Sequence, residues 1–103
     1  MDVEILHISN CPSWVEAGER LRSALDERGL ESTAIRYRLL STAADAADAT
    51  FSGSPTILVD GVDLFPGAAR SQDLSCRIYV TPDGVSGVPS TDQIVEALGA
   101  HVG

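Results

Sequence analysis

At 103 residues, the chain is long enough for one folded domain with its own core and too short for two. Its formal net charge is −8, and no segment concentrates Lys or Arg, which argues against nucleic acid or an anionic membrane surface as the partner. No apolar run approaches the ~18 residues that span a bilayer, and the first residues show no secretory signal, so we expect a cytoplasmic protein.

The first predicted elements are a buried strand and the helix that follows it. Residues 3–8 form a short apolar run rich in branched side chains, which indicates the strand. Pro12 suits the first turn of the helix, and Gly29 suits the left-handed residue that ends it after Arg28. One apolar stripe at offsets of three and four residues runs along this helix, formed by Trp14, Gly18, Leu21 and Leu25.

A second strand and a short helix are predicted next. Residues 33–39 alternate between apolar and polar side chains, which predicts a strand with one polar face. Residues 41–42 can cap a short Ala-rich helix that runs to about Thr50. The small polar residues 52–54 then end this helix.

The sequence after residue 55 predicts a β-hairpin. Residues 56–59 and 62–65 are its two strands, and the Asp60-Gly61 pair between them supplies the positive φ angles of a tight turn. Residues 66–74 are mostly small or polar, so we expect a loop there.

One more strand and a final helix complete the predicted fold. Residues 76–80 indicate a strand that ends at a turn over residues 82–84, and residues 90–93 indicate a capping box before an apolar run. The predicted α/β order is β-α-β-α-β-β-α, with an extended segment before the last helix, in a single domain over residues 1–103.

Cys11 is the first candidate functional residue, because it lies between the first strand and the first helix. A cysteine at a helix N-terminus gains from the positive end of the helix dipole, which lowers the pKa of its thiol below ~8.5. The resulting thiolate is the form that attacks disulfides and binds soft metals. The alternative is an ordinary buried thiol at a turn.

The order of elements, with Cys11 after the first strand and Ser54-Pro55-Thr56 before the third, resembles the thioredoxin-like fold. The resemblance implies a four-stranded mixed sheet flanked by helices, with Pro55 in a cis peptide bond beside Cys11. More narrowly, residues 11–14 (Cys-Pro-Ser-Trp) and 76–79 (Cys-Arg-Ile-Tyr) are similar to motifs of small actinobacterial proteins. Those proteins are labelled thioredoxin-family proteins or relatives of alkylmercury lyase.

Cys76 is the second candidate, because Trp14 stands where the usual Cys-x-x-Cys motif of that fold has its second cysteine. The local motif therefore has one thiol and does not by itself predict a reductant. Cys76 could be the resolving thiol, a second ligand to a soft metal, or a small buried hydrophobe. Which role it has depends on the distance between the two sulfurs.

Two thiolates that meet would suit Hg(II), Cu(I) or a reversible disulfide, and not a four-ligand zinc site. His7 could add a third ligand, or it could be a satisfied core residue in its strand. Cleavage of a carbon–mercury bond would also need a general acid. Asp63 and Asp73 are the acidic residues nearest in sequence to Cys76.

The remaining candidates have a binding role and a structural alternative. Trp14 could wall a shallow apolar groove beside the thiol, or it could simply begin the buried helical stripe. Arg77 and Tyr79 could bind a small anion or substrate, or they could form the exposed face of a strand. The residues that we expect to contact a substrate are Pro12, Trp14, Ser54, Pro55 and Thr56.

Three functions remain open on this sequence. The first is thiol–disulfide exchange by Cys11, with Cys76 as possible resolver, no cofactor, and a protein or small-molecule thiol or disulfide as substrate. The second is binding of mercury or another soft metal by both thiols. The third is a thioredoxin-like scaffold without thiol chemistry.

Overall fold

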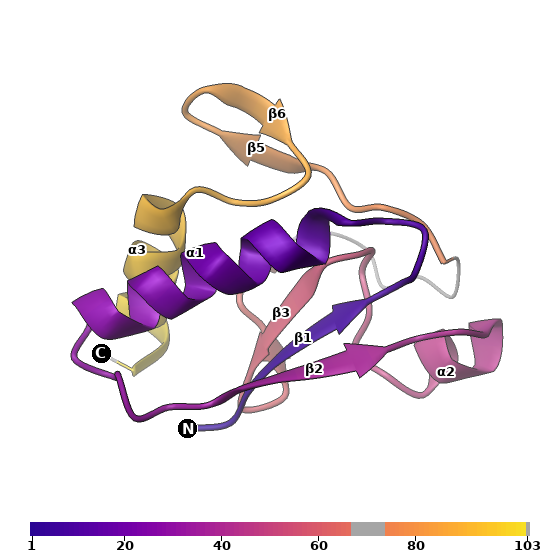
Figure 1. Cartoon of the computed structure of the whole chain (residues 1–103), viewed down its shortest axis with the longest axis horizontal. Helices are drawn as coiled ribbons and strands as arrows, with labels where there is room; N and C mark the ends of the chain where they lie inside the picture. Colours follow the sequence, from indigo (N-terminus) through magenta and orange to yellow (C-terminus); the bar gives the residue numbers. More distant parts are fainter. Residues whose placement is uncertain (67–73, 103) are drawn as a thin grey trace.

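The computed structural model describes residues 1–66 and 74–102. β1 to β4 form one sheet, and β5 and β6 form a separate two-stranded hairpin that projects from the body (Figure 1). In chain order, the elements are β1 (Val3–His7), α1 (Ser13–Glu27), β2 (Ile35–Leu39), α2 (Ala43–Ala47), β3 (Thr56–Val59), β4 (Val62–Asp63), β5 (Tyr79–Thr81), β6 (Gly84–Ser86) and α3 (Thr91–Val102).

The main sheet has the strand order β2-β1-β3-β4 and is mixed. β1 runs parallel to β2, antiparallel to β3, and β3 runs antiparallel to β4. Ile5 on β1 is the partner of Ile57 on β3, so the two central strands place fully buried side chains opposite each other. The predicted α/β class with a four-stranded mixed sheet is confirmed.

α1 and α3 pack on one face of this sheet, and α2 lies beyond the end of β2 (Figure 1). Alternate residues of a strand point to opposite faces, which divides the core into two clusters. Ile5 and Ile57 pack in the larger cluster with the apolar sides of α1 and α3. Leu6 and Leu58 pack in the smaller cluster with α2 and Phe51. The site described below lies at the end of β1 where the chain leaves the sheet for α1.

The local signals for helix ends and turns are confirmed. Gly29 ends α1 with a φ of +76°. Thr42 and Asp45 form a reciprocal capping box at α2. At α3, the N–H of Gln93 donates to Ser90 Oγ and the N–H of Ser90 donates to Gln93 Oε1. These pairs satisfy N–H groups that have no partner inside the helix.

Several elements are shorter than the sequence predicts. β1 ends at His7, one residue before the end of the predicted strand. β2 begins at Ile35 and lies at the edge of the sheet, which leaves Tyr37 and Leu39 about half exposed. α2 ends at Ala47, earlier than the predicted Thr50. β4 ends at Asp63, because the side chain of Asp63 accepts the N–H of Phe65 and turns the backbone out of the strand ladder.

The segment after residue 74 differs most from the prediction. The strand predicted over residues 76–80 begins only at Tyr79, and it pairs with β6, which the sequence did not predict. The turn over residues 82–84 is confirmed, with Gly84 at a φ of +112°. The loop predicted over residues 66–74 lies largely outside the described residues.

Candidate functional site

Cys11 lies between β1 and α1 and is buried, with 2% of its surface exposed. Pro12 caps the helix, and the N–H of Cys11 donates to the carbonyl of Ile8 at 3.4 Å. Cys11 packs with Leu6 and Phe51 in the smaller core cluster. Cys11 therefore lies two residues before the first residue of α1, a 15-residue helix, close to the positive end of the helix dipole.

Cys76 is bonded to Cys11 through a disulfide. The two Cα atoms are 5.9 Å apart, well within the limit of about 7 Å for such a bond. Unlike Cys11, Cys76 is an exposed residue. The question that the sequence left open, whether the two sulfurs meet, is therefore answered by the fold, and the alternative of Cys76 as a buried hydrophobe is wrong.

Ser54 holds the Cys76 segment in place. Its N–H donates to the carbonyl of Ser75 and its carbonyl accepts the N–H of Arg77, both at 2.8 Å, which makes a parallel β-bridge between Ser54 and Cys76. Ser54 Oγ accepts the N–H of Ile8 at 3.1 Å. Every polar group of this fully buried residue is therefore used, and the Cys11 sulfur lies 3.6 Å from its carbonyl oxygen.

The residues around Ser54 shape the same loop. The Ser54–Pro55 bond is cis, as the resemblance implied. Thr56 is buried, and its hydroxyl donates to the carbonyl of Gly53. Gly53 has a φ of +108°, and a Cβ there would come within 2.8 Å of the Cβ of Arg77. Only glycine lets the Cys76 segment approach this loop so closely.

Arg77 and Tyr79 anchor the Cys76 segment from the inside. Arg77 is buried, pairs with Asp63 at 2.9 Å, donates to the carbonyl of Phe65 and lies over the ring of Tyr79. The hydroxyl of Tyr79 donates to the carbonyl of Pro55, and burial raises the pKa of Tyr79. The alternative in which Arg77 and Tyr79 form the exposed face of a strand is therefore wrong, and their partners inside the protein do not favour binding of a small anion or substrate.

Asp63 is equally engaged, because its carboxylate accepts both the Arg77 guanidinium and the N–H of Phe65. That arrangement does not fit a free general acid beside the thiols. Asp73, the other acid considered, lies outside the described residues.

Trp14 is only partly buried. It packs against the larger core cluster, whereas Cys11 belongs to the smaller one. Its ring stacks on His7 with centroids 4.3 Å apart and meets Tyr37 edge-on at 5.6 Å. Both alternatives therefore hold in part: Trp14 packs against the buried stripe of α1, and it also lines an open, mainly apolar surface pocket with Gly18 and Tyr37.

His7 is buried, and its Nδ1 has no hydrogen-bond partner among residues 1–66 and 74–102. Burial lowers the pKa of its imidazole, because the charged form loses its solvation. No cluster of three or more His, Cys, Asp or Glu suited to a metal ion is found in the described part of the chain. The proposed third-ligand role of His7 is not supported there.

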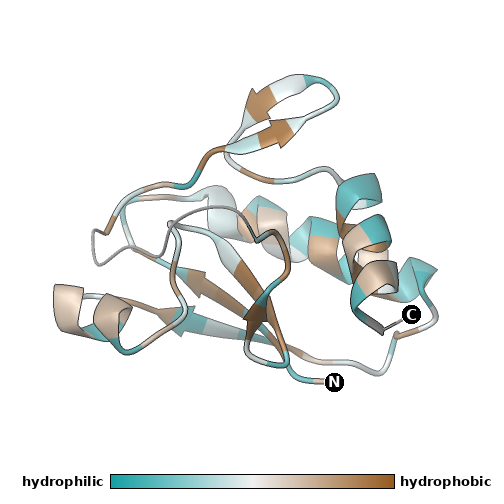
Figure 2. Cartoon of the chain, turned by 180° about the vertical axis from the view of Figure 1, so that it is seen from behind, coloured by the Kyte–Doolittle hydropathy of each residue, from teal (hydrophilic) through white to brown (hydrophobic). Residues whose placement is uncertain are grey.

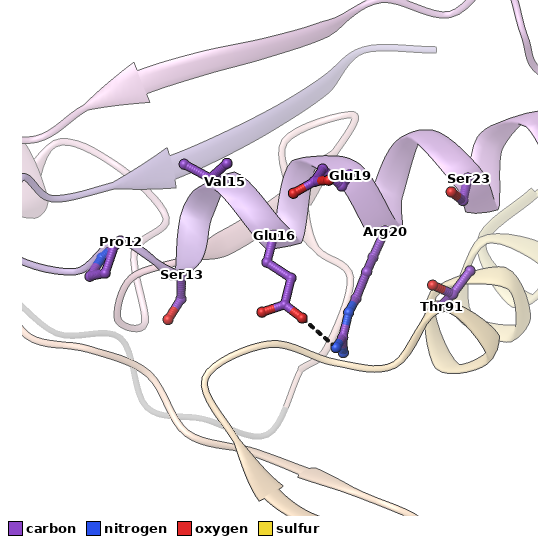
Figure 3. A pocket seen from close by; sticks show the side chains of 8 residues that line it. All are labelled: Pro12, Ser13, Val15, Glu16, Glu19, Arg20, Ser23 and Thr91. Atoms are coloured by element: carbon purple, nitrogen blue, oxygen red, sulfur yellow. Dashed lines mark hydrogen bonds and ion pairs between the residues drawn. The ribbon is translucent and has the colours of Figure 1, made fainter.

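An open groove of about 600 Å³ begins directly after Cys11 (Figure 3). One side of α1 lines it from Pro12 to Ser23, and Thr91 of α3 closes its far end. Glu16 and Arg20 form an ion pair along α1 on one wall of the groove, and Arg20 also donates to the carbonyl of Pro89. Of the predicted contact residues, Pro12 therefore faces a surface depression, whereas Ser54 and Thr56 are fully buried.

Comparison with protein-family models, curated proteins and solved structures gives no match for this chain. Among the described residues, no helix has both the length and the apolar character needed to cross a membrane. The candidate site therefore rests on the geometry of the chain itself.

We expect Arg77→Met to destabilise the protein by about 3–5 kcal/mol, because it leaves the Asp63 carboxylate buried without its partner. Urea unfolding would measure the loss. Arg36→Met is the matched control, since its pair with Asp2 is exposed and should contribute less than about 1 kcal/mol. Equal losses in the two variants would contradict this view of the anchor.

The lowered pKa of His7 predicts that stability falls as the pH drops below about 6.5. In that range the unfolded chain binds a proton at His7 more readily than the folded chain does. The free energy of unfolding, measured by urea between about pH 7.5 and 5.5, should decline less in His7→Phe. Leu39→Gln, at a half-exposed residue of β2 that does not titrate, is the control and should decline like the parent; a parental slope in His7→Phe would refute the prediction.

Proposed function

We propose that the chain is a thioredoxin-like thiol–disulfide exchange protein whose redox pair is Cys11 and Cys76. The observation that carries the proposal is the disulfide between these residues beside the Ser54–Pro55 loop. The order of the elements around the mixed sheet also agrees with the resemblance seen in the sequence. We propose the cytoplasm as its compartment, where a lasting structural disulfide is uncommon and an exchanging one is expected.

The two sulfurs have complementary surroundings for this chemistry. Cys11 precedes a long helix, whose N-terminal dipole stabilises a thiolate. Cys76 supplies the second thiol that the Trp14 position lacks. The Cys76 segment is docked on the Ser54–Pro55 loop by hydrogen bonds that do not involve sulfur. The reduced pair would therefore stay close together and could close again without a large rearrangement.

The exchange balances as a two-electron reaction. A dithiol substrate loses two electrons and two protons and becomes a disulfide, and the Cys11–Cys76 disulfide gains them and becomes two thiols. The reverse direction reduces a substrate disulfide. Which direction operates is set by the reduction potentials of the protein and its partner.

Incubation of the reduced protein with glutathione disulfide tests this proposal. We expect the parent chain to form the internal Cys11–Cys76 disulfide, seen by intact mass as the loss of two hydrogens without a glutathione adduct. Cys11→Ser and Cys76→Ser should instead end as glutathione adducts or remain reduced, and Ser75→Ala, a neighbouring exposed residue, should behave like the parent. A parent chain that never closes the internal disulfide would exclude the function.

Soft-metal binding is the second candidate. It is favoured by one observation: two sulfurs meet, and no larger group of His, Cys, Asp or Glu suited to a metal accompanies them in the described residues. Two thiolates alone suit a soft ion that accepts two ligands, such as Hg(II). The lyase variant of this candidate has less support, because Asp63 is paired with Arg77.

For soft-metal binding, we expect the reduced chain to bind one Hg(II) per molecule. The measurement is a titration monitored by the thiolate-to-metal charge-transfer absorption band. Cys76→Ser should weaken the complex by at least about 100-fold, because one of two ligands is lost. Ser75→Ala again serves as the control. Equal affinity in Cys76→Ser would exclude a two-sulfur site.

A further inference from the structure

The two sulfurs of the disulfide differ in access. Cys11 is 2% exposed and backed by Leu6 and Phe51 of the core, whereas Cys76 is an exposed residue. A thiolate that breaks a disulfide must reach one sulfur from the side opposite the bond that breaks. Cys11 is buried among core side chains and Cys76 is exposed, so the open approach is to Cys76.

The leaving group favours the same choice. When Cys76 is attacked, Cys11 leaves with the electron pair as a thiolate. It leaves next to the N-terminus of α1, where the helix dipole stabilises negative charge. The position of the helix N-terminus therefore favours Cys11 as the leaving group, and access favours Cys76 as the attacked sulfur, so the two effects act together.

An apolar surface continues from Cys76 along the same segment. Ile78, Val80 and Val85 are 73%, 77% and 75% exposed, and Val80 lies opposite Val85 in the hairpin. Each strand of the hairpin has a stretch coloured as hydrophobic in Figure 2, where the hairpin projects from the body. We call these three side chains the apolar ridge.

The ridge reverses the usual arrangement of an amphipathic strand. Arg77 and Tyr79 point inward and are buried, while the β-branched side chains between and after them face solvent. Apolar residues normally occupy the buried side because their transfer from water is favourable. The inversion leaves the ridge without a partner in the described chain, directly beside the accessible sulfur.

We propose that Cys76 is the sulfur that a partner attacks, and that the partner is a protein dithiol whose apolar segment docks on the ridge. This inference rests on the proposed exchange function. In the first step the partner thiolate bonds to Cys76, the Cys11–Cys76 bond breaks, and Cys11 leaves as a thiolate. The second partner thiol, once deprotonated, then attacks the partner's own sulfur and releases Cys76 as a thiolate. The partner ends as a disulfide.

The dimensions and the chemistry favour a protein over the other occupants. An extended segment rises about 3.3 Å per residue, so Cys76 to Val80 spans about 13 Å, more than a single cysteine-sized thiol covers. A second oxidised copy of this chain brings no thiol, because both of its cysteines are already bonded. Reaction with the disulfide requires a partner that carries a thiol. Binding to the apolar ridge requires that this thiol lie in or beside an apolar segment of the partner.

The test uses the oxidised full-length chain and two peptides, each with one cysteine flanked by valines or by serines. After a short reaction, N-ethylmaleimide blocks free thiols and peptide mapping locates the adduct. We expect the peptide on Cys76 and N-ethylmaleimide on Cys11. A peptide adduct on Cys11 would overturn the assignment of the accessible sulfur.

The rates test the ridge. The valine peptide should react about tenfold faster than the serine peptide, and Val80→Thr with Val85→Thr should remove that preference without changing the rate with glutathione. Leu39→Thr, a half-exposed residue on β2, is the control and should keep the preference. Equal rates with the two peptides in the parent chain would overturn the docking role.

Two further outcomes distinguish failure of the docking inference from failure of the proposed exchange function. If the disulfide exchanges with glutathione and the ridge has no effect, the exchange function stands and the docking inference fails. If neither peptide nor glutathione opens the disulfide, both fail. Sedimentation of the oxidised chain gives the remaining case, because a dimer that Val80→Thr with Val85→Thr dissociates would assign the ridge to self-association and overturn the proposed partner.

Discussion

Three parts of the chain that are distant in sequence meet at Ser54. Its hydroxyl accepts the N–H of Ile8 at the end of β1, and its backbone pairs with Ser75 and Arg77 on the segment that carries Cys76. Because Ser54 is fully buried, each of these bonds replaces one that water can no longer provide, and losing one costs about 1–3 kcal/mol. The meeting of the two sulfurs depends on this hydrogen bonding more than on any property of the sulfurs.

Much of the fold could be predicted because its signals are local. The Asp60-Gly61 turn and the pairing of Ser90 with Gln93 are encoded within four residues, and both are present in the structure. The position of Cys76 could not be read in this way. It depends on one isolated β-bridge and on an ion pair between Arg77 and Asp63, which are tertiary contacts that no periodicity records.

The segment around Tyr79 is where sequence reasoning was most misleading. The alternation over residues 76–80 correctly puts Arg77 and Tyr79 on one side, but it does not tell which side is buried. Hydrophobicity alone would bury Ile78 and Val80, and the structure buries the other pair. The signal that could have corrected this lies in Asp63, the one charged residue in the strand predicted over residues 62–65, because a carboxylate there needs a cation if it is to be shielded from water.

The two cysteines are held by different structural elements. In a motif with both cysteines on one helix turn, the two thiols share a single rigid element. Here Cys11 belongs to the junction of β1 and α1, and Cys76 belongs to a segment anchored by hydrogen bonds and an ion pair. A change in the anchor can therefore alter the distance between the thiols without any change in the helix.

The Cys11–Cys76 bond joins residues 65 positions apart, so the oxidised chain is a covalent ring that contains α1, β2, α2 and the β3–β4 hairpin. Closing a loop of that length removes chain entropy from the unfolded state worth about 4 kcal/mol. Small domains have a total margin of only about 5–15 kcal/mol. Reduction of the disulfide would therefore remove a large share of the free energy of unfolding. The stability of the folded protein would then depend on how reducing its surroundings are.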